Sequence, residues 1–337
     1  MGFLTDNFLS RFFVDVINLF HGFTGDYVLA MLLFVLLVKV LLLPLDVKSK
    51  RSTLKTQMVQ PKINAIRERY KNDPQKQSIA LRELYKKEDI KMTAGCLPML
   101  LQLPILFAMF GAIRILSNTQ SIELVVGLAN GQSVLPPSFL WIRNIWQPDT
   151  GHSPVMPSLA EFSTAVSTVG KMDPTILQSA QDVLHYSAVN QFAGATSGLT
   201  DTTLLGNLFS TAYQTIPADL VQTASALNYQ TVITPVLEAH AGFNNGYYVL
   251  PLLTFVTQWI LARMQTKQQA MTTGSVSGSN FMMELLMPLM IAWFAMTTGA
   301  LFALYWTVGN LWSLGQSLVL NKVLTKSLNE AAAPAKK

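Results

Sequence analysis

The sequence predicts an all-α polytopic membrane protein with five transmembrane helices, a cytoplasmic helical hairpin and an external helical insertion. Half of the 337 residues are hydrophobic and only 13% are charged, a balance typical of membrane proteins and unusual for a soluble domain of this length. Five apolar segments approach the length of about 20 residues that a hydrocarbon core requires. The cations are concentrated between the first two of these segments.

The apolar runs define the elements in order. The last two spans are separate because residues 285–320 as one helix would be about 54 Å long, and "TTG" at 297–299 is the expected turn. We predict an external interfacial helix at 1–26, spans at 27–47, 94–116, 247–265, 281–296 and 300–320, a cytoplasmic hairpin at 48–93, an external loop at 117–246, a cytoplasmic loop at 266–280 and a cytoplasmic basic tail at 321–337.

The first segment has the pattern of an amphipathic helix lying in the outer interface. Its hydrophobic residues share one helical face: Leu9, Phe12, Phe13, Val16 and Phe20. A secretory signal peptide is not expected here, because there is no basic start and Arg11 and Asp15 interrupt the apolar run.

The charges predict the orientation of the spans. Residues 48–93 hold thirteen Lys and Arg against five Asp and Glu, whereas residues 117–245 hold two cations against eight acids. Cytoplasmic loops carry the excess of Lys and Arg. We therefore expect the N-terminus outside and the C-terminus in the cytoplasm.

The hairpin at 48–93 is predicted to contain two amphipathic helices. Asp73 before Pro74 in "YKNDPQ" is a favourable start for the second helix. Apolar residues recur at helical spacing on both sides of this turn: Val59, Ile63, Ile66 and Tyr70 before it, and Leu81, Leu84 and Tyr85 after it. The hairpin either merely fixes the topology or docks lipid head groups, nascent chains or ribosomal RNA. Its length favours docking.

The chain lacks residues arranged for bond-breaking chemistry. Cys96 is its single cysteine, its four histidines fall outside the apolar spans, and no Gly-rich phosphate loop or nucleotide fingerprint occurs. We expect no catalytic residue, no metal site and no cofactor, and a protein that is not an enzyme.

Lys39 stands out within the apolar run "LLFVLLVKVLLLPL". It lies about 10 Å from the cytoplasmic end of its span, where an ammonium costs about 2.5–3.5 kcal/mol. We place the acids Asp46 and Glu284 near the cytoplasmic ends of their spans. Lys39 either stretches to the inner head groups or lies in a cavity that water reaches, and its position alone favours neither.

Four motifs occur in the order in which one family has them. They are "QPKINAIRERYKNDPQKQ" (Gln60–Gln77), "GCLPMLLQLPILFAMF" (Gly95–Phe110), "LLMPLM" (Leu285–Met290) and "LYWTVGNLWSLGQ" (Leu304–Gln316). Together they resemble the YidC family of membrane protein insertases, and the resemblance covers all five spans and the hairpin. The chain departs from the family at Lys39, where the family has Arg, and in the turn "TGALF", where it has Phe-Pro-Ala-Gly-Leu.

The external loop carries a further family motif in two pieces. Relatives read roughly "LW…DPYYILPIL" without interruption, whereas here "FLWIRNIWQPD" ends at Asp149 and "NNGYYVLPLL" resumes at Asn244. Residues 150–243 are therefore predicted to be an inserted helical subdomain. We expect a tolerated surface insertion without a separate function.

The resemblance implies an insertase of the bacterial plasma (inner) membrane, with a groove that is open to cytoplasm and lipid and contains one cation. It favours the groove over snorkelling for Lys39, and hydrophobic transfer of the client into lipid would drive the reaction without nucleotide. The candidate groove residues are Lys39, Gln102, Gln258, Tyr305 and Trp306. The last four also have ordinary roles, since Gln pairs helices and Tyr and Trp prefer interfaces. Nascent membrane proteins and the lipid bilayer are the implied partners, with the ribosome and the Sec translocon as candidates and no small-molecule substrate.

Two other classes of function remain open at this point. A small transporter or channel could use Lys39 as an intramembrane anion site, but the sequence shows neither internal repeats nor facing discontinuous helices. A receptor could sense a signal through residues 150–243. Flux assays in liposomes separate the transporter from the insertase.

The predicted orientation can be tested by cysteine labelling in a Cys96→Ser background. Cysteines near Lys71 should react with a membrane-impermeant maleimide only from the cytoplasmic side, and cysteines near Gly198 only from outside, because the cations retain the hairpin in the cytoplasm. Labelling of both positions from one side would contradict the five-span model.

Overall fold

The computed structural model describes residues 7–88, 90, 97–169, 218–240, 244–273 and 281–332. The chain forms two compact units, one of Met1–Ala112 with Tyr248–Lys337 (unit 1) and one of Ile113–Tyr247 (unit 2). Helix α6 (Leu97–Ala129) contributes its first part to unit 1 and its second part to unit 2.

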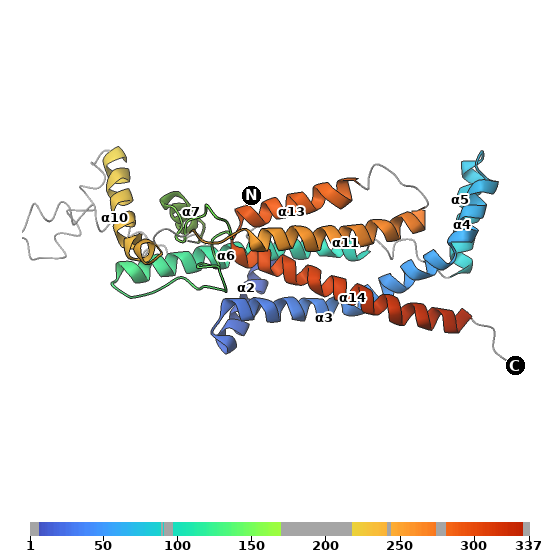
Figure 1. The fold of residues 1–337 in the computed structure, drawn as a ribbon, viewed down its shortest axis with the longest axis horizontal. Helices are drawn as coiled ribbons and strands as arrows, with labels where there is room; N and C mark the ends of the chain where they lie inside the picture. The colour runs from blue at the N-terminus through green and yellow to red at the C-terminus, as the bar shows by residue number, and fades with distance from the viewer. Residues whose placement is uncertain are drawn as a thin grey trace, which may run out of the picture. The chain divides into compact units, whose positions relative to one another are not determined.

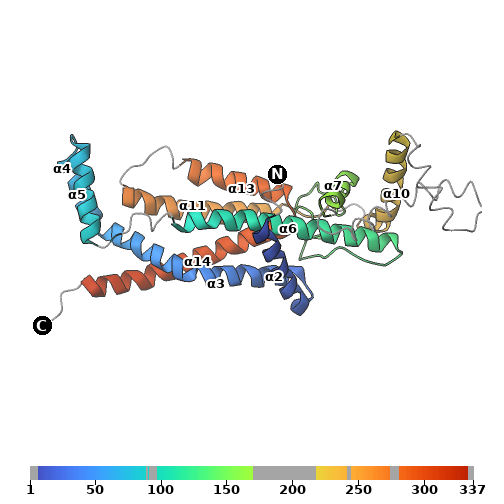
Figure 2. The ribbon, with the colours of Figure 1, turned by 180° about the vertical axis from the view of Figure 1, so that it is seen from behind.

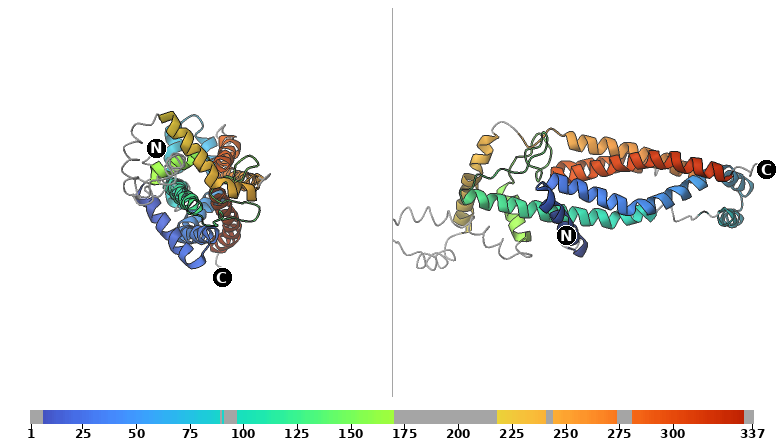
Figure 3. Two further views of the ribbon diagram at one scale, coloured as in Figure 1. Left: turned by 90° about the vertical axis from the view of Figure 1, so that its left-hand side faces the viewer. Right: turned by 90° about the horizontal axis from the view of Figure 1, so that it is seen from below.

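Long helices that lie side by side form most of unit 1 (Figures 1 and 3). Helix α14 packs against α3 and against α11, and α11 also packs against α13. These elements are α2 (Phe8–Thr24), α3 (Tyr27–Met58), α11 (Val249–Thr273), the π-helical turn η2 (Met282–Leu286), α13 (Met287–Thr297) and α14 (Ala300–Ala332).

Helix α2 crosses α3 near the start of α3 (Figure 1). Asn7 caps its first turn by accepting a hydrogen bond from Ser10 N (2.9 Å), and Gly25 ends it at a φ of 65°, which only glycine adopts at little cost. Phe13 packs edge-on against Phe34 of α3, with ring centroids 4.9 Å apart. The hydrophobic side chains of α2 differ in exposure. Phe13 and Ile17 are buried, whereas Phe8, Phe12, Leu19 and Phe23 are exposed.

Two of the described helices are long and apolar enough to cross a membrane, residues 27–58 and 102–129, and the apolar helix at 282–297 is shorter. Helices α11 and α14 carry buried polar residues, which lower their mean hydropathy: Thr254, Thr257, Gln258 and Thr266 on α11, and Thr307 and Asn310 on α14. Hydropathy alone therefore does not identify α11 and α14 as spans.

The hairpin consists of α4 (Gln60–Arg69) and α5 (Pro74–Lys87), which pack against each other (Figure 2). Asp73 caps α5 by accepting a hydrogen bond from Lys76 N (3.0 Å), which lowers the pKa of the Asp73 carboxyl. The small core of the hairpin consists of the buried residues Val59, Ile63 and Ile90. Three partly buried residues pack against it: Leu81, Leu84 and Tyr85. Ile66 and Tyr70, which we expected on the same face as Ile63, line a separate hollow.

The helix that precedes the last span contains a π-helical turn. Pro288 has no N–H, so the carbonyl of Glu284 lacks its usual α-helical donor. Next to it, in η2, Met287 N donates to Met282 O, which is five residues back and not four. The following helix α13 ends at Thr297 and α14 begins at Ala300, so the chain reverses where "TTG" occurs.

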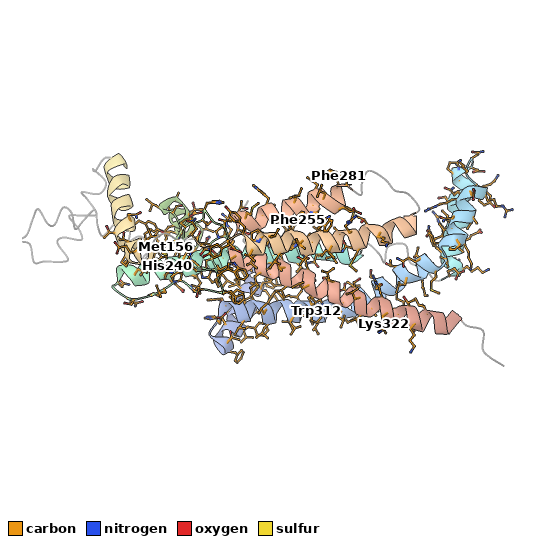
Figure 4. The ribbon with its side chains drawn as sticks, viewed as in Figure 1. Met156, His240, Phe255, Phe281, Trp312 and Lys322 are labelled. Carbon is orange, nitrogen blue, oxygen red and sulfur yellow. The ribbon has the colours of Figure 1, made fainter. Side chains whose placement is uncertain are left out.

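Unit 2 has its own hydrophobic core, built by the second part of α6, by α7 (Leu159–Val169) and by α10 (Ala218–Ala239). The Phe162 and Tyr229 rings pack with centroids 5.1 Å apart. Tyr229 Oη donates to Pro157 O (2.6 Å), and burial raises the pKa of this phenol. Buried Met156 and His240, the residue that follows α10, lie in this same unit (Figure 4).

The two pieces of the external motif meet in unit 2. Asn245 Oδ1 accepts from Asn144 N (2.7 Å), and its Nδ2 donates to Asn144 O (2.9 Å). Asp149 accepts from Trp141 Nε1 (3.1 Å) and from Tyr247 N (2.8 Å). A Cβ at position 246 would overlap Asp149 Oδ1, so only glycine fits between these two segments.

The core of unit 2 extends beyond the predicted insertion at 150–243. Ile122 and Val125 of α6 are 1% and 0% exposed, and they belong to the same cluster as Phe162 and Ile233. The sequence predicted a span at 94–116, whereas helix α6 continues to Ala129. Residues 150–243 therefore share their core with a segment that comes before the external motif.

This shared core predicts the outcome of removing residues 150–243 by joining Asp149 to Asn244 through a short linker. The shortened chain should give less monodisperse protein and a lower melting temperature, because Ile122 and Val125 lose burial that contributes roughly 1.5–3 kcal/mol each. Size-exclusion chromatography in detergent and a thermal-shift assay measure both effects.

The pair of substitutions Ile122→Ser and Val125→Ser is the matched control. It should destabilise the full-length chain, where both positions are buried, and improve the shortened chain, where both become exposed. If the shortened chain were as stable with Ile122 and Val125 as with serine, the shared core would be unimportant.

Candidate functional site

Helix α14 presents polar side chains to α3 on one side. Hydrogen bonds between side chains join the two helices: Lys39 Nζ to Ser313 Oγ (3.0 Å), Gln316 Nε2 to Asp46 Oδ2 (2.9 Å) and Lys50 Nζ to Ser317 Oγ (3.1 Å). Trp312 Nε1 donates to Gln316 Oε1 (2.8 Å), so the donor end of that amide faces Asp46. Trp312 lies where α14 passes α3 (Figure 4).

A second set of polar contacts joins α14 to α11. Trp306 Nε1 donates to Gln258 Oε1 (3.0 Å), the hydroxyls of Thr254 and Thr307 are 2.9 Å apart, and Asn310 Nδ2 donates to Thr257 Oγ1 (3.2 Å). All except Trp306 are buried. Because a bilayer offers no water to unpaired polar groups, these bonds hold the two helices in one register.

Lys39 is half-buried and faces α14. Asp46, two turns further along α3 and about 10 Å away along the helix axis, is held by Gln316. The nearest group to the ammonium is thus a neutral hydroxyl and not a carboxylate. A cation held in this way keeps hydrogen-bonding capacity for an anionic group that approaches it.

The structure brings together only some of the predicted groove residues. Gln258 and Trp306 are directly bonded. Tyr305 is 7% exposed and packs beside Phe302, whose ring lies 5.9 Å from that of Phe110. It therefore belongs to an aromatic cluster between α14 and α6. Gln102 is half-buried on α6, and within the described part of the chain no hydrogen bond joins it to the other four.

Sequence reasoning missed a polar cluster between α11 and η2. Glu284 accepts a hydrogen bond from Thr266 Oγ1 and lies 3.9 Å from Arg263 Nε. The Arg263 guanidinium also lies 4.9 Å from the centre of the Trp259 ring. The expected position of Glu284 near the cytoplasmic end of its span stays a prediction.

Ser313 was also missed. A lone serine in an apolar helix carries no pattern of its own, and only its position opposite Lys39 gives it meaning. The available signal was its spacing: Ser313 lies seven residues after Trp306, three after Asn310 and three before Gln316, and residues at such spacings lie on the same or neighbouring faces of one helix.

A hollow of about 380 Å³ lies on the hairpin, between α4 and α5. Arg69 and Lys87 flank it, and the Arg69 guanidinium lies 5.6 Å from the centre of the Tyr70 ring. The hollow is lined by Ala65, Ile66, Arg69, Tyr70, Ala80, Glu83, Leu84 and Lys87. The lining thus combines apolar residues with two cations, Arg69 and Lys87, and one acid, Glu83.

Comparison with known proteins places this geometry in a family. The chain matches the family model described as 60Kd inner membrane protein over residues 19–223 and 172–327. A membrane protein insertase YidC of Clostridium perfringens is 33% identical over 170 residues, which is 48% of this chain and 64% of that protein. The one of Geobacter sulfurreducens is 29% identical over 219 residues, or 65% of this chain and 38% of that protein.

A third relative of the same name, from Aeromonas hydrophila, is 32% identical over 206 residues, which is 60% of this chain and 34% of that protein. The chain thus spans less than two thirds of the length of each of these relatives. The family match covers most of the chain, and the resemblance to YidC proteins found in the motifs is confirmed. The chain belongs to the 60Kd inner membrane protein family.

Proposed function

We propose that the protein is a membrane insertase that moves short hydrophilic tails across the bilayer and releases apolar segments into it. The observation that carries this proposal is Lys39: a cation on an apolar helix whose hydrogen-bond partner is the neutral Ser313. The named relatives, all called membrane protein insertases, support it. The reaction moves a chain between environments and requires no catalytic group, nucleotide or metal.

The five predicted spans are part of this proposal, with the N-terminus outside and the C-terminus in the cytoplasm. The long α3 and α6 supply two of them. We assign α11, η2 with α13, and α14 as the other three, because their buried polar residues are paired between helices and so need not meet lipid.

In the proposed mechanism, the tail of a client enters a hydrated groove from the cytoplasm. Its Asp and Glu side chains are attracted to Lys39, which compensates part of the cost of moving them into the bilayer. The apolar segment then partitions into lipid beside α6 and α13, whose exposed side chains include Phe107, Leu289 and Trp293. Hydrophobic transfer drives this step.

The hairpin provides a first contact for clients in this scheme. The hollow between α4 and α5 combines apolar residues with Arg69 and Lys87, a surface that fits the amphipathic segments of nascent membrane proteins. The ribosome and the Sec translocon are further proposed partners, and the positive charge of the hairpin supports contact with RNA phosphates.

Substitutions of Lys39 test the proposed function. Lys39→Arg should keep activity because the charge remains, whereas Lys39→Met, which is similar in length but neutral, and Lys39→Glu should lose it. Insertion of clients with Asp or Glu in the tail should fall by about fivefold or more with Met, as expected from losing roughly 1 kcal/mol of attraction. Protease protection of tail-tagged clients in vesicles measures insertion.

Clients with neutral tails are the control, because their transfer depends on hydration and not on attraction. Full insertion of an acidic-tailed client by the Lys39→Met variant would mean that the ammonium merely reaches the inner head groups. An anion flux through liposomes that disappears with the same variant would instead favour a channel or transporter.

A further inference from the structure

The environment of Lys39 on α14 is built from two residues one turn apart, Gly309 and Ser313, which we call the lysine seat. Ser313 Oγ accepts a hydrogen bond from Lys39 Nζ at 3.0 Å. The Cε atom of Lys39 lies 3.7 Å from where a Cβ of residue 309 would be. The side chain of Lys39 therefore runs over Gly309 and ends at Ser313.

The Ser313 hydroxyl has a fixed direction. It donates its own proton to Gly309 O at 2.9 Å, one turn back along α14. Its lone pairs are then directed away from the helix axis, and the hydroxyl meets Lys39 purely as an acceptor. The two residues of the seat are thus coupled, because the carbonyl of one orients the hydroxyl of the other.

The seat leaves most of the ammonium unused. A lysine ammonium has three N–H donors, and within the described chain Ser313 accepts one of them. A carboxylate in place of Ser313 would neutralise the charge, and an apolar residue would leave the ammonium without a fixed position. A neutral acceptor fixes the position of the charge while leaving it available to a ligand.

We propose that Gly309 and Ser313 are positioning residues that hold the Lys39 ammonium against α14 and direct its two free donors at the carboxylates of acidic client tails. This inference rests on the proposed insertase function and assigns the selectivity for acidic tails to the seat as well as to the charge. Gly309 provides the space and Ser313 the acceptor.

The test compares Ser313→Thr with Ser313→Val, which have nearly the same shape but differ in the hydroxyl. The measurement is the ratio of acidic-tail to neutral-tail insertion in the protease-protection assay, with the membrane level of each variant determined by immunoblot. Threonine should preserve the ratio. Valine should lower it by about threefold to tenfold, the range for one hydrogen bond between membrane helices.

The same pair is then compared in a Lys39→Met background. Because Ser313 acts through Lys39, valine should cause no further fall in the ratio there. A fall of the same size in both backgrounds would show that Ser313 supports the helix packing and not the lysine. If valine and threonine gave equal ratios while Lys39→Met lost acidic-tail insertion, the seat would be wrong and the proposed function would stand.

Gly309 offers an independent variant if Ser313→Val fails to accumulate. Gly309→Ala places its Cβ at an ordinary contact distance from Lys39 Cε and should preserve the ratio. Gly309→Leu should fill the path of the lysine and lower the ratio as Ser313→Val does. A leucine variant with an unchanged ratio would also overturn the seat.

Discussion

The hydrogen bonds that α14 makes to helices on both of its sides are the constraint on which unit 1 depends. Towards α11 the bonds are between neutral groups, such as the Thr254 and Thr307 hydroxyls, and towards α3 they involve the charged groups of Lys39, Asp46 and Lys50. Hydrocarbon cannot replace any of these partners. A shift of α14 along either neighbour by one turn would break bonds on both sides at once. Polar pairing therefore fixes the position of the helix along both neighbours.

This arrangement separates two tasks that one helix performs. On the α11 side, neutral polar groups are paired with one another, as the buried pair Asn310 and Thr257 illustrates. On the α3 side, and within the described residues, the Lys39 ammonium is hydrogen-bonded to the neutral Ser313, while the carboxylate of Asp46 is bonded to Gln316. The hydrogen bonds to α11 hold α14 in place. Because α14 cannot shift to bring a further partner to Lys39, the free-energy cost of placing this cation in an apolar environment remains.

The elements of the fold were largely predictable, because helices, caps and turns depend on neighbours in the chain. The apolar runs located α3 and α14, and Asp73 before Pro74 located the start of α5. Contacts between helices depend on rotation about each axis, which sequence spacing does not determine. The packing of Tyr305 against Phe302 was therefore not predicted, and Ser313 was overlooked although it accepts a hydrogen bond from Lys39. The shared core of unit 2 was not predicted for a related reason: Ile122 was assigned to the loop at 117–246, and sequence spacing does not show that it packs in one cluster with Phe162.

The pairing of Asn144 with Asn245 has a consequence for the biogenesis of the protein itself. The two residues are 101 positions apart, and synthesis at about 5–20 residues per second takes roughly 5–20 s to cover that distance. During this interval the Asn144 backbone N–H lacks the acceptor that Asn245 Oδ1 provides. The carbonyls of Gln147 and Pro148 likewise lack the hydrogen bonds that the Asn245 side chain donates to them. The segment that contains Asn144 therefore leaves the ribosome without these contacts, and they form only after Asn245 has been synthesised. A protein that we propose inserts unfinished chains into the membrane is therefore itself incompletely folded until Asn245 has been synthesised.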